Sequence, residues 1–197
     1  MKPGIAFFDF DGTITTKDTL IEFIKFSKGT LAFYSGFAIH APYLLAYKAG
    51  LMNNQKAKER ILSHFFDSVS VQEFEHWCSN FSKKVLPLLI RPAAITEIKK
   101  MQASGIQTVI VSASPHYWIS EWAREMNMEI IATELQITNG MLTGRIAGIN
   151  CHGKEKVRRI KDKYQLDSFH KIYAYGDTKG DLPMLSLAHH SFMKPFR

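Results

Sequence analysis

Two aspartates end the first apolar segment of the chain at a spacing that suits metal or phosphate chemistry. Asp9 and Asp11 lie two residues apart, so both side chains can leave a strand on the same side before Gly12 turns the chain. Two buried like charges are unfavourable unless a cation lies between them or one is protonated. Magnesium, which binds carboxylates, water and phosphate oxygens, would relieve that repulsion. A solvated Asp-Gly turn is the alternative that this pair alone leaves open.

Further polar residues follow two other predicted strands. Asp177 comes after the apolar run 172–175 and Gly176, and Asp181 follows four residues later. Ser112 ends the run 108–111, where its hydroxyl group and nearby backbone N–H groups can bind an anion. Structural alternatives exist for both positions, since Asp181 can cap a helix and a lone serine is more often structural.

A basic helix is predicted over residues 154–164. Lys154 opens this helix directly after Gly153. Several other lysines and arginines follow in the same segment, so a solvated basic face is the alternative interpretation of Lys154.

Alternating strands and helices must position these residues. Buried strands are predicted from continuous apolar runs over 4–10, 108–111, 130–132 and 172–175. The run 172–175 is predicted to be the last strand. A helix is predicted over 93–103. Pro115 is expected to begin another helix capped by Ser114, and Asn139-Gly140 predicts a hairpin turn. The pattern predicts an α/β fold with an open parallel sheet, in which ligands bind beyond the carboxyl ends of the strands.

The segment between Gly12 and Pro87 has helical periodicity throughout and interrupts this alternation. Within it, residues 29–47 contain no Asp, Glu, Lys or Arg. The length of this uncharged stretch is close to the roughly 20 residues that span a bilayer. A single span would put Asp9 and Ser112 on opposite sides of the membrane, so it is excluded if the two share one site. Two alternatives remain, a buried helix pair bent at Pro42 or an interfacial segment.

The interfacial alternative rests on the side chains of this stretch and its flanks. Aromatic residues would contact lipid tails, and flanking lysines would lie near anionic headgroups. The aromatic residues are Phe33, Tyr34, Phe37, Tyr43 and Tyr47, and the lysines are Lys25, Lys28 and Lys48.

The charge balance indicates an anionic partner. The chain has 197 residues with 25 Lys and Arg against 18 Asp and Glu, a formal net charge of +7. Its two cysteines are too few for a disulfide framework, and acidic residues appear too early for a secretory signal, so a cytoplasmic location is expected. A basic nucleic-acid-binding module is a distant alternative, because no helix-turn-helix or zinc-finger pattern is present.

Taken together, these residues resemble the haloacid-dehalogenase-like (HAD) phosphotransferases over nearly the whole chain. The resemblance is carried by the run Asp9-Phe10-Asp11-Gly12-Thr13, then Ser112, Lys154 and the pair Asp177 and Asp181, in that order. Within the superfamily the chain looks most like the branch that includes phosphoserine phosphatase and the bacterial phosphatidylglycerophosphatase C type. This resemblance implies a Rossmann-like three-layer α/β/α core over residues 1–14 and 88–197, with an all-α cap inserted over residues 15–87.

The resemblance also implies a role for each matching residue. Asp9 would be the nucleophile that forms an aspartyl-phosphate, and Asp11 the general acid and then base. Mg²⁺ would be held by the Asp9 side chain, the Asp11 backbone carbonyl and Asp177. The supporting and phosphate-binding positions are Thr13, Ser112, Ala113, Lys154, Gly176 and Asp181.

Two cap positions are candidates for substrate specificity. Asp18 stands where phosphoserine phosphatases use a glutamate to bind the substrate amino group, and it is one methylene shorter; Arg60 is a candidate for a second anionic group. The predicted activity is a magnesium-dependent phosphatase acting on a small-metabolite phosphate or a lipid headgroup. Phosphoserine phosphatase and phosphotransferase are alternatives within the superfamily. No nucleic-acid partner is expected, and peripheral contact with the inner membrane through the cap is an alternative to a purely cytoplasmic location.

Overall fold

The fold is built on one five-stranded parallel sheet, described over residues 3–197 in a computed structural model. The strand order is β3-β2-β1-β6-β7, and β4 and β5 form a separate antiparallel hairpin. The strands are β1 (Gly4–Phe8), β2 (Ile106–Pro115), β3 (Glu129–Thr133), β4 (Leu135–Thr138), β5 (Met141–Ile146), β6 (Lys171–Gly176) and β7 (His190–Met193). The helices are α1 (Thr19–Lys28), α2 (Thr30–Lys48), α3 (Asn54–Phe66), α4 (Val71–Lys84), α5 (Leu86–Leu89), α6 (Pro92–Ala103), α7 (Ser120–Glu125), α8 (Lys154–Lys163) and α9 (Leu182–Leu185).

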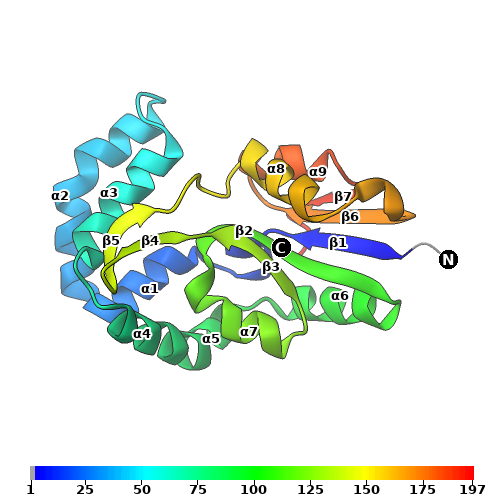
Figure 1. The fold of residues 1–197 in the computed structure, drawn as a ribbon, viewed down its shortest axis with the longest axis horizontal. Coiled ribbons are helices and arrows are strands. Elements are labelled where there is room, and N and C mark those ends of the chain that lie inside the picture. Colours follow the sequence, from blue (N-terminus) through cyan, green and yellow to red (C-terminus); the bar gives the residue numbers. More distant parts are fainter. Residues whose placement is uncertain (1–2) are drawn as a thin grey trace.

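Side chains of the central strand β1 alternate between two hydrophobic cores. Ile5 and Phe7 belong to the core beneath α8 and α9, whereas Ala6 and Phe8 belong to the core shared with α6 and helices α1 to α4. Because both faces of β1 are covered, every one of its residues is buried. Helices therefore lie on both sides of the sheet, as Figure 1 shows, and the predicted three-layer α/β/α arrangement is confirmed.

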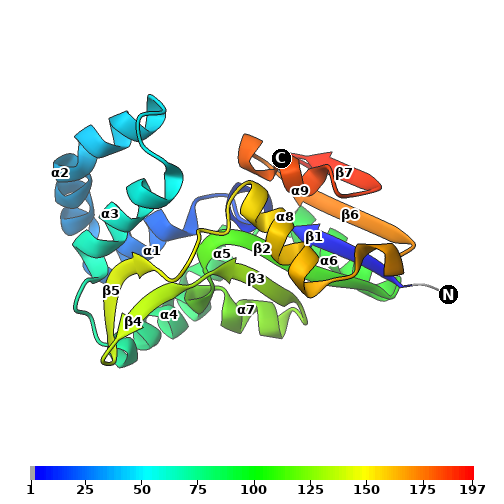
Figure 2. The ribbon, with the colours of Figure 1, turned by 45° about the horizontal axis from the view of Figure 1, so that its top comes forward.

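Helices α1 to α4 form a second body beyond one end of the sheet (Figure 2). Phe23 of α1 lies at its centre and makes edge-on contacts with the rings of Phe74 and Phe81. The same ring stacks on Trp118, which follows β2, at a centroid distance of 4.6 Å. This aromatic cluster joins the helical segment to the sheet domain, since Phe23 and Trp118 are both fully buried.

The hairpin β4–β5 packs against the helical segment. Gly144 of β5 approaches Ser63 of α3, whose Oγ donates a hydrogen bond to the Gly144 carbonyl at 3.3 Å. Glu59 of α3 accepts a hydrogen bond from the Ile146 amide at 3.1 Å. The hairpin therefore packs against α3, although the predicted ranges assign it to the core. The division of the chain into a core and a cap over residues 15–87 stays a prediction.

Several predicted elements are confirmed and three are wrong. The hairpin turn and the helix from residue 154 are present. Pro115 does not begin a helix but ends β2, because the extended strand continues past Ser112. The strand at 172–175 is followed by one more, β7. Residues 30–48 form one helix, not a buried pair, and only Phe33 and Gly36 of it are buried.

Membrane-spanning helices are not found among residues 3–197, where no helix is both long enough and apolar enough to cross a bilayer. Helix α2 is the element with the longest uncharged stretch, and Pro42 lies within it.

We expect Gly144→Ala to destabilise the protein more than Gly148→Ala. Both glycines have positive φ, which alone costs an alanine about 1–2 kcal/mol. A Cβ at Gly144 would in addition overlap the Ser63 backbone, whereas nothing lies within 4 Å of one at Gly148. Urea unfolding measures the difference. Equal losses in the two variants would show that the hairpin does not dock tightly on α3.

Candidate active site

The loop after β1 directs two carboxylates into a common pocket. Asp9 has an extended backbone and is buried, and the following turn depends on Gly12, whose φ is +77°. A Cβ at residue 12 would overlap the carboxylate of Asp177, so the turn needs glycine both for its backbone conformation and for this close approach. The ends of β1 and β6 are thereby held side by side, as expected for neighbouring strands of a parallel sheet.

A buried lysine balances the charge of these acids. Lys156, on the first turn of α8, is 1% exposed. Its Nζ donates hydrogen bonds to Asp9 Oδ1 at 2.6 Å and to Asp181 Oδ1 at 2.7 Å. Burial alone would lower the pKa of Lys156, but the two carboxylates outweigh burial and raise it, so this side chain stays charged.

The predicted lysine, Lys154, does not face these carboxylates in the structure, and its role in binding phosphate stays a prediction. It lies on the exposed side of α8, whereas Lys156 shares the buried side with Ile160, four residues later. Residues four apart lie on one face of a helix, and a residue two positions away points elsewhere. The spacing to Ile160 was therefore the sequence signal that could have identified Lys156.

The surroundings shift the pKa values of Asp9 and Asp181 in opposite directions. Burial, only partly offset by Lys156, raises the pKa of Asp9 to about 7. Burial also acts on Asp181, but Lys156 and the hydrogen bonds from Thr178 outweigh it and lower the pKa of that carboxyl. Thr13 donates a hydrogen bond to Asp9 Oδ2 at 3.1 Å, which orients the carboxylate.

Asp11 is held by hydroxyl and backbone donors instead of a cation. Thr19 donates to Asp11 Oδ1 through its amide at 2.7 Å and its hydroxyl at 2.6 Å. Ser114 donates to Asp11 Oδ2 at 2.5 Å, so its side chain binds this aspartate and does not cap a helix. Burial, followed by the nearby charge of Asp18, raises the pKa of Asp11, while the hydrogen bonds oppose the rise. A raised pKa suits a carboxyl that must carry a proton.

Three carboxylates could hold a metal ion. Ligand oxygens of Asp9, Asp177 and Asp181 lie within 4.8 Å of one another, and all three residues are buried. Asp177 Oδ1 is buried without a hydrogen-bond partner, while its Oδ2 accepts from Arg197 at 2.6 Å. A buried oxygen without a donor and a set of hard carboxylate ligands both fit Mg²⁺. Burial and the charge of Asp181 raise the pKa of Asp177, and a cation would oppose that rise.

The remaining predicted core residues lie around this cluster. Ser112 is fully buried and its Oγ accepts a hydrogen bond from the Ser114 amide at 3.0 Å, which shapes the end of β2. Ala113 lines the pocket next to the aspartates. Gly176 has no room for a side chain, because a Cβ there would lie 3.0 Å from Asp181 Cγ. The structure thus brings together the predicted residues from three strand ends.

The helical segment contributes residues to the same pocket, which has a volume of about 430 Å³. Lys58 of α3 lines it and donates a hydrogen bond to the Ala113 carbonyl at 3.0 Å. Asn54 and His152 also line it. Burial lowers the pKa of Lys58, with Asp18 and Asp11 opposing the shift. None of these three residues was identified from the sequence, because only folding brings α3 over the strand ends.

The two predicted specificity residues lie in different places. Asp18 lines the pocket, and its carboxylate caps α1 by accepting hydrogen bonds from the Leu20 and Ile21 amides. Arg60 does not line it; its guanidinium lies 4.8 Å from the centre of the Tyr43 ring, in a separate pocket that also contains Arg145. Lys58, not Arg60, is the cation that α3 directs to the aspartates.

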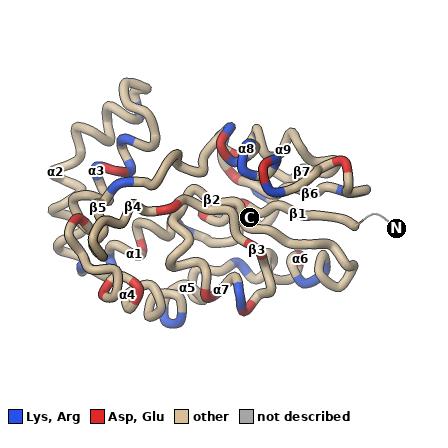
Figure 3. The backbone as a smooth tube through the Cα atoms, in the orientation of Figure 1, with Lys and Arg blue, Asp and Glu red and all other residues tan. Residues whose placement is uncertain are grey.

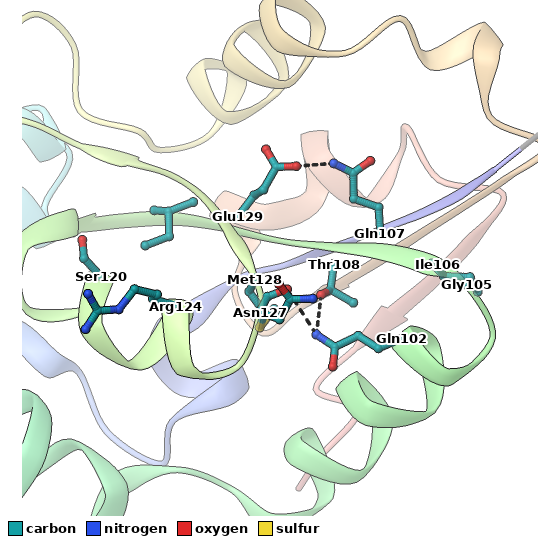
Figure 4. A pocket seen from close by; sticks show the side chains of 11 residues that line it. Gln102, Gly105, Ile106, Gln107, Thr108, Ser120, Arg124, Asn127, Met128 and Glu129 are labelled. Carbon is teal, nitrogen blue, oxygen red and sulfur yellow. Dashed lines mark hydrogen bonds between the residues drawn. The ribbon is translucent and has the colours of Figure 1, made fainter.

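Another pocket, shown in Figure 4, lies at the opposite edge of the sheet. It is lined by the beginnings of β2 and β3, and its polar side chains bond to one another: Gln102 to Thr108, and Gln107 to Glu129. None of the predicted site residues lines it. Its lining contains none of the buried aspartates that line the pocket at the strand ends, so the candidate active site is the pocket at the strand ends.

Comparison by sequence finds relatives that match the chain over its length. The protein CicA from Caulobacter vibrioides is 33% identical over 198 residues, covering 100% of this chain and 88% of the relative. A probable phosphatase from Mycobacterium tuberculosis is 26% identical over 199 residues, covering 98% of this chain and 69% of the relative.

Comparison by structure finds phosphoserine phosphatases among the solved neighbours. A phospho-aspartyl intermediate analogue of phosphoserine phosphatase superposes with a TM-score of 0.72 at 17% identity, covering 98% of this chain and 87% of that one. At this identity the likeness establishes a shared fold.

The family assignment rests on the match over most of the chain. A family model for haloacid dehalogenase-like hydrolases matches residues 6–186, a range that contains the carboxylates after β1 and β6 and the lysine of α8. With that match, and with CicA 33% identical over 100% of this chain and 88% of its own length, the resemblance predicted from the motifs is confirmed, and the chain belongs to the haloacid dehalogenase-like hydrolase family.

Proposed function

We propose that the protein is a magnesium-dependent phosphatase that hydrolyses a phosphomonoester through an aspartyl-phosphate on Asp9. The observation that carries the proposal is the buried carboxylate of Asp9 bonded to Lys156, beside a second carboxyl, Asp11, whose pKa is raised. The phosphatases among the relatives and structural neighbours add support.

The residues present can divide the reaction into two steps. An Asp9 oxygen attacks phosphorus and forms a P–O bond, while the bond to the substrate oxygen breaks and Asp11 gives that oxygen its proton. Asp11, now ionised, then takes a proton from water, whose oxygen attacks phosphorus and releases phosphate from Asp9. Lys156 lies beside Asp9 and can offset the negative charge of the phosphoryl oxygens in both steps.

Asp9, Asp177 and Asp181 bring carboxylate oxygens together that could hold Mg²⁺, and the family resemblance adds the Asp11 carbonyl to Asp9 and Asp177 as a ligand. When bound, the ion would supply positive charge to the phosphoryl oxygens. Asp181 accepts hydrogen bonds from Thr178 and Lys156, which fixes the carboxylates around the site before any ion binds.

The substrate is proposed to carry a second anionic group that Lys58 binds. Lys58 is the cation that α3 contributes to the pocket, and a neutral carbonyl, that of Ala113, is its hydrogen-bond partner. A phosphorylated metabolite and a phospholipid headgroup both satisfy this requirement, and the second suits a location at the cytoplasmic side of the inner membrane. Phosphoserine also has a second anionic group in its carboxylate, but it is less well matched at its amino group, because Asp18 is one methylene shorter than glutamate and its Oδ1 accepts from the α1 amides. Transfer to an alcohol in place of water would use the same aspartyl-phosphate.

Asp9→Asn is expected to reduce the hydrolysis of an aryl phosphate on the order of 10⁴-fold, because the amide is not a nucleophile. Asp11→Asn should reduce the rate of hydrolysis about 10²–10⁴-fold, because the amide cannot transfer a proton. Removing divalent ions with EDTA should abolish wild-type turnover, and Mg²⁺ should restore it. Equal turnover by wild type and Asp9→Asn would contradict the proposal.

Lys156→Met and Lys154→Met should differ sharply in both stability and activity. Loss of Lys156 leaves Asp9 and Asp181 buried without a cation, which costs about 3–5 kcal/mol. The same change at exposed Lys154 should cost less than about 0.5 kcal/mol and leave turnover intact. Urea unfolding and aryl phosphate hydrolysis measure the two effects, and a reversed order would restore Lys154 as the phosphate-binding residue.

Lys58→Met should raise KM for substrates with a second anionic group, with little change for an aryl phosphate whose phosphoryl group is its only charged group. Glycerophosphate diesters carrying a terminal phosphomonoester have the second anionic group, and glycerol 3-phosphate lacks it, so the two allow the comparison. Lys56→Met is the matched control, since Lys56 is exposed on the same helix and does not line the catalytic pocket. A uniform change of KM for all substrates in Lys58→Met would remove the basis for a second anionic group.

A further inference from the structure

Helix α2 exposes an unusual amount of apolar surface. Of its 19 residues, only Phe33 and Gly36 are buried. Its exposed side chains include Leu31 at 89%, Leu45 at 65% and Ile39 at 62%, and Leu51 in the turn that follows is 84% exposed. Isolated exposed leucines are ordinary, but several on one helix and its turn mark an interaction surface. We call α2 together with the turn to Leu51 the α2 surface.

The α2 surface has no polar face. Its only Asp, Glu, Lys or Arg residue is Lys48, at the carboxyl end of the helix. The neighbouring helix α3 has the opposite character, since its buried side is apolar and its outer side carries charged and polar residues. Figure 3 shows α2 largely without charged segments and α3 with several. Water is therefore a poor environment for α2, although it is a suitable one for α3.

The charges around the α2 surface have one sign over a long stretch. No Asp or Glu occurs between Glu22 and Glu59, whereas that stretch contains five lysines, at positions 25, 28, 48, 56 and 58. Among the ion pairs of residues 3–197, Lys48 and Lys56 take no part. Arg60 and Arg145 lie in one pocket with Lys56. An apolar face bordered by unpaired cations complements an anionic interface with an apolar interior.

Tyrosines lie where such an interface would change from apolar to polar. Tyr34 is 64% exposed, and Tyr43 and Tyr47 are each 38% exposed. The Tyr47 hydroxyl accepts a hydrogen bond from Asn54 Nδ2 at 3.1 Å, and Asn54 lines the catalytic pocket. One end of the α2 surface is thus linked directly to the wall of the pocket. Tyrosine is favoured at membrane interfaces because its ring is apolar and its hydroxyl is polar.

We propose that the α2 surface docks on the anionic surface of a lipid bilayer, with α2 lying in the plane of the headgroups. The apolar side chains enter the outer acyl region, while Lys48 and Lys56 contact anionic headgroups. The α2 surface is separate from the reacting groups, so the docking proposal can be tested independently of the phosphatase proposal. Docking would also hold the pocket near the membrane, through the contact between Tyr47 and Asn54.

Flotation with lipid vesicles tests the proposal. Wild type should float with vesicles of phosphatidylcholine and phosphatidylglycerol at low salt, and much less with phosphatidylcholine alone. The triple variant Leu31→Gln, Leu45→Gln, Leu51→Gln should lower the partition coefficient on the order of tenfold or more. Lys48→Glu with Lys56→Glu should weaken binding to the anionic vesicles only.

Two leucines outside the cap provide the matched control. Leu88 and Leu182 are 81% and 49% exposed, and Leu88→Gln with Leu182→Gln should float as wild type does. All variants should hydrolyse a soluble aryl phosphate at the wild-type rate, which separates failure of docking from failure of catalysis.

Three results would overturn the proposal. The first is wild type that stays at the bottom of the gradient with anionic vesicles. The second is an equal loss of flotation in the Leu88 and Leu182 control. The third is a concentration-dependent dimer in analytical ultracentrifugation that the triple variant abolishes while flotation is unaffected, because the α2 surface would then bind a second copy of the chain.

Discussion

The buried ammonium group of Lys156 between Asp9 and Asp181 is the interaction on which the active site depends. Five acidic side chains line one pocket, and without a cation their burial and mutual repulsion would favour protonation. Lys156 binds two of them directly, and its own burial is tolerated because both partners are charged and well placed. The hydrogen bonds of Lys156 thus hold two of the carboxylates in fixed positions, and positioned charge is what phosphoryl transfer requires of a site.

The parallel sheet explains how distant parts of the chain reach this lysine. Strands β1, β2 and β6 are adjacent and run in one direction, so the loops that follow them meet at one edge. Gly12 and Gly176 allow the loops to approach one another closely. Helix α8 returns across the sheet with Lys156 on its first turn, directed at the same edge. Each of these charged groups thus lies at a strand end or in the first turn of a helix.

The helical segment closes the site from the other side and adds a distinct character to it. Phe23 and Trp118 join the two parts through stacked rings, and Lys58 reaches across to the Ala113 carbonyl. Its outermost helix, α2, is apolar on its exposed side, where an ordinary cap helix would be polar. One body therefore contributes both a cation to the pocket and an apolar surface to the exterior. The carboxylates and Lys156 thus belong to the sheet domain, whereas Lys58 and the exposed apolar side chains of α2 belong to the helices.

The sequence by itself determined the α/β class, the aspartate pairs and the family, because apolar runs that end in Asp9 and Asp177 are local patterns. It also predicted the turn at Asn139-Gly140, whose geometry depends on two residues. The spacing of Lys156 to Ile160 indicates the buried side of α8, but tertiary structure decided that this side faces the carboxylates. Tertiary structure alone decided which hydroxyl binds Asp11, and that Lys58 enters the pocket in place of Arg60. The Ser114 hydroxyl reaches Asp11 because β2 continues past Ser112. The positions of Lys156 and Lys58 depend on how far α8 and α3 are rotated about their axes against the sheet. That rotation is fixed by packing between residues far apart in the chain, as in the contact of Gly144 with Ser63.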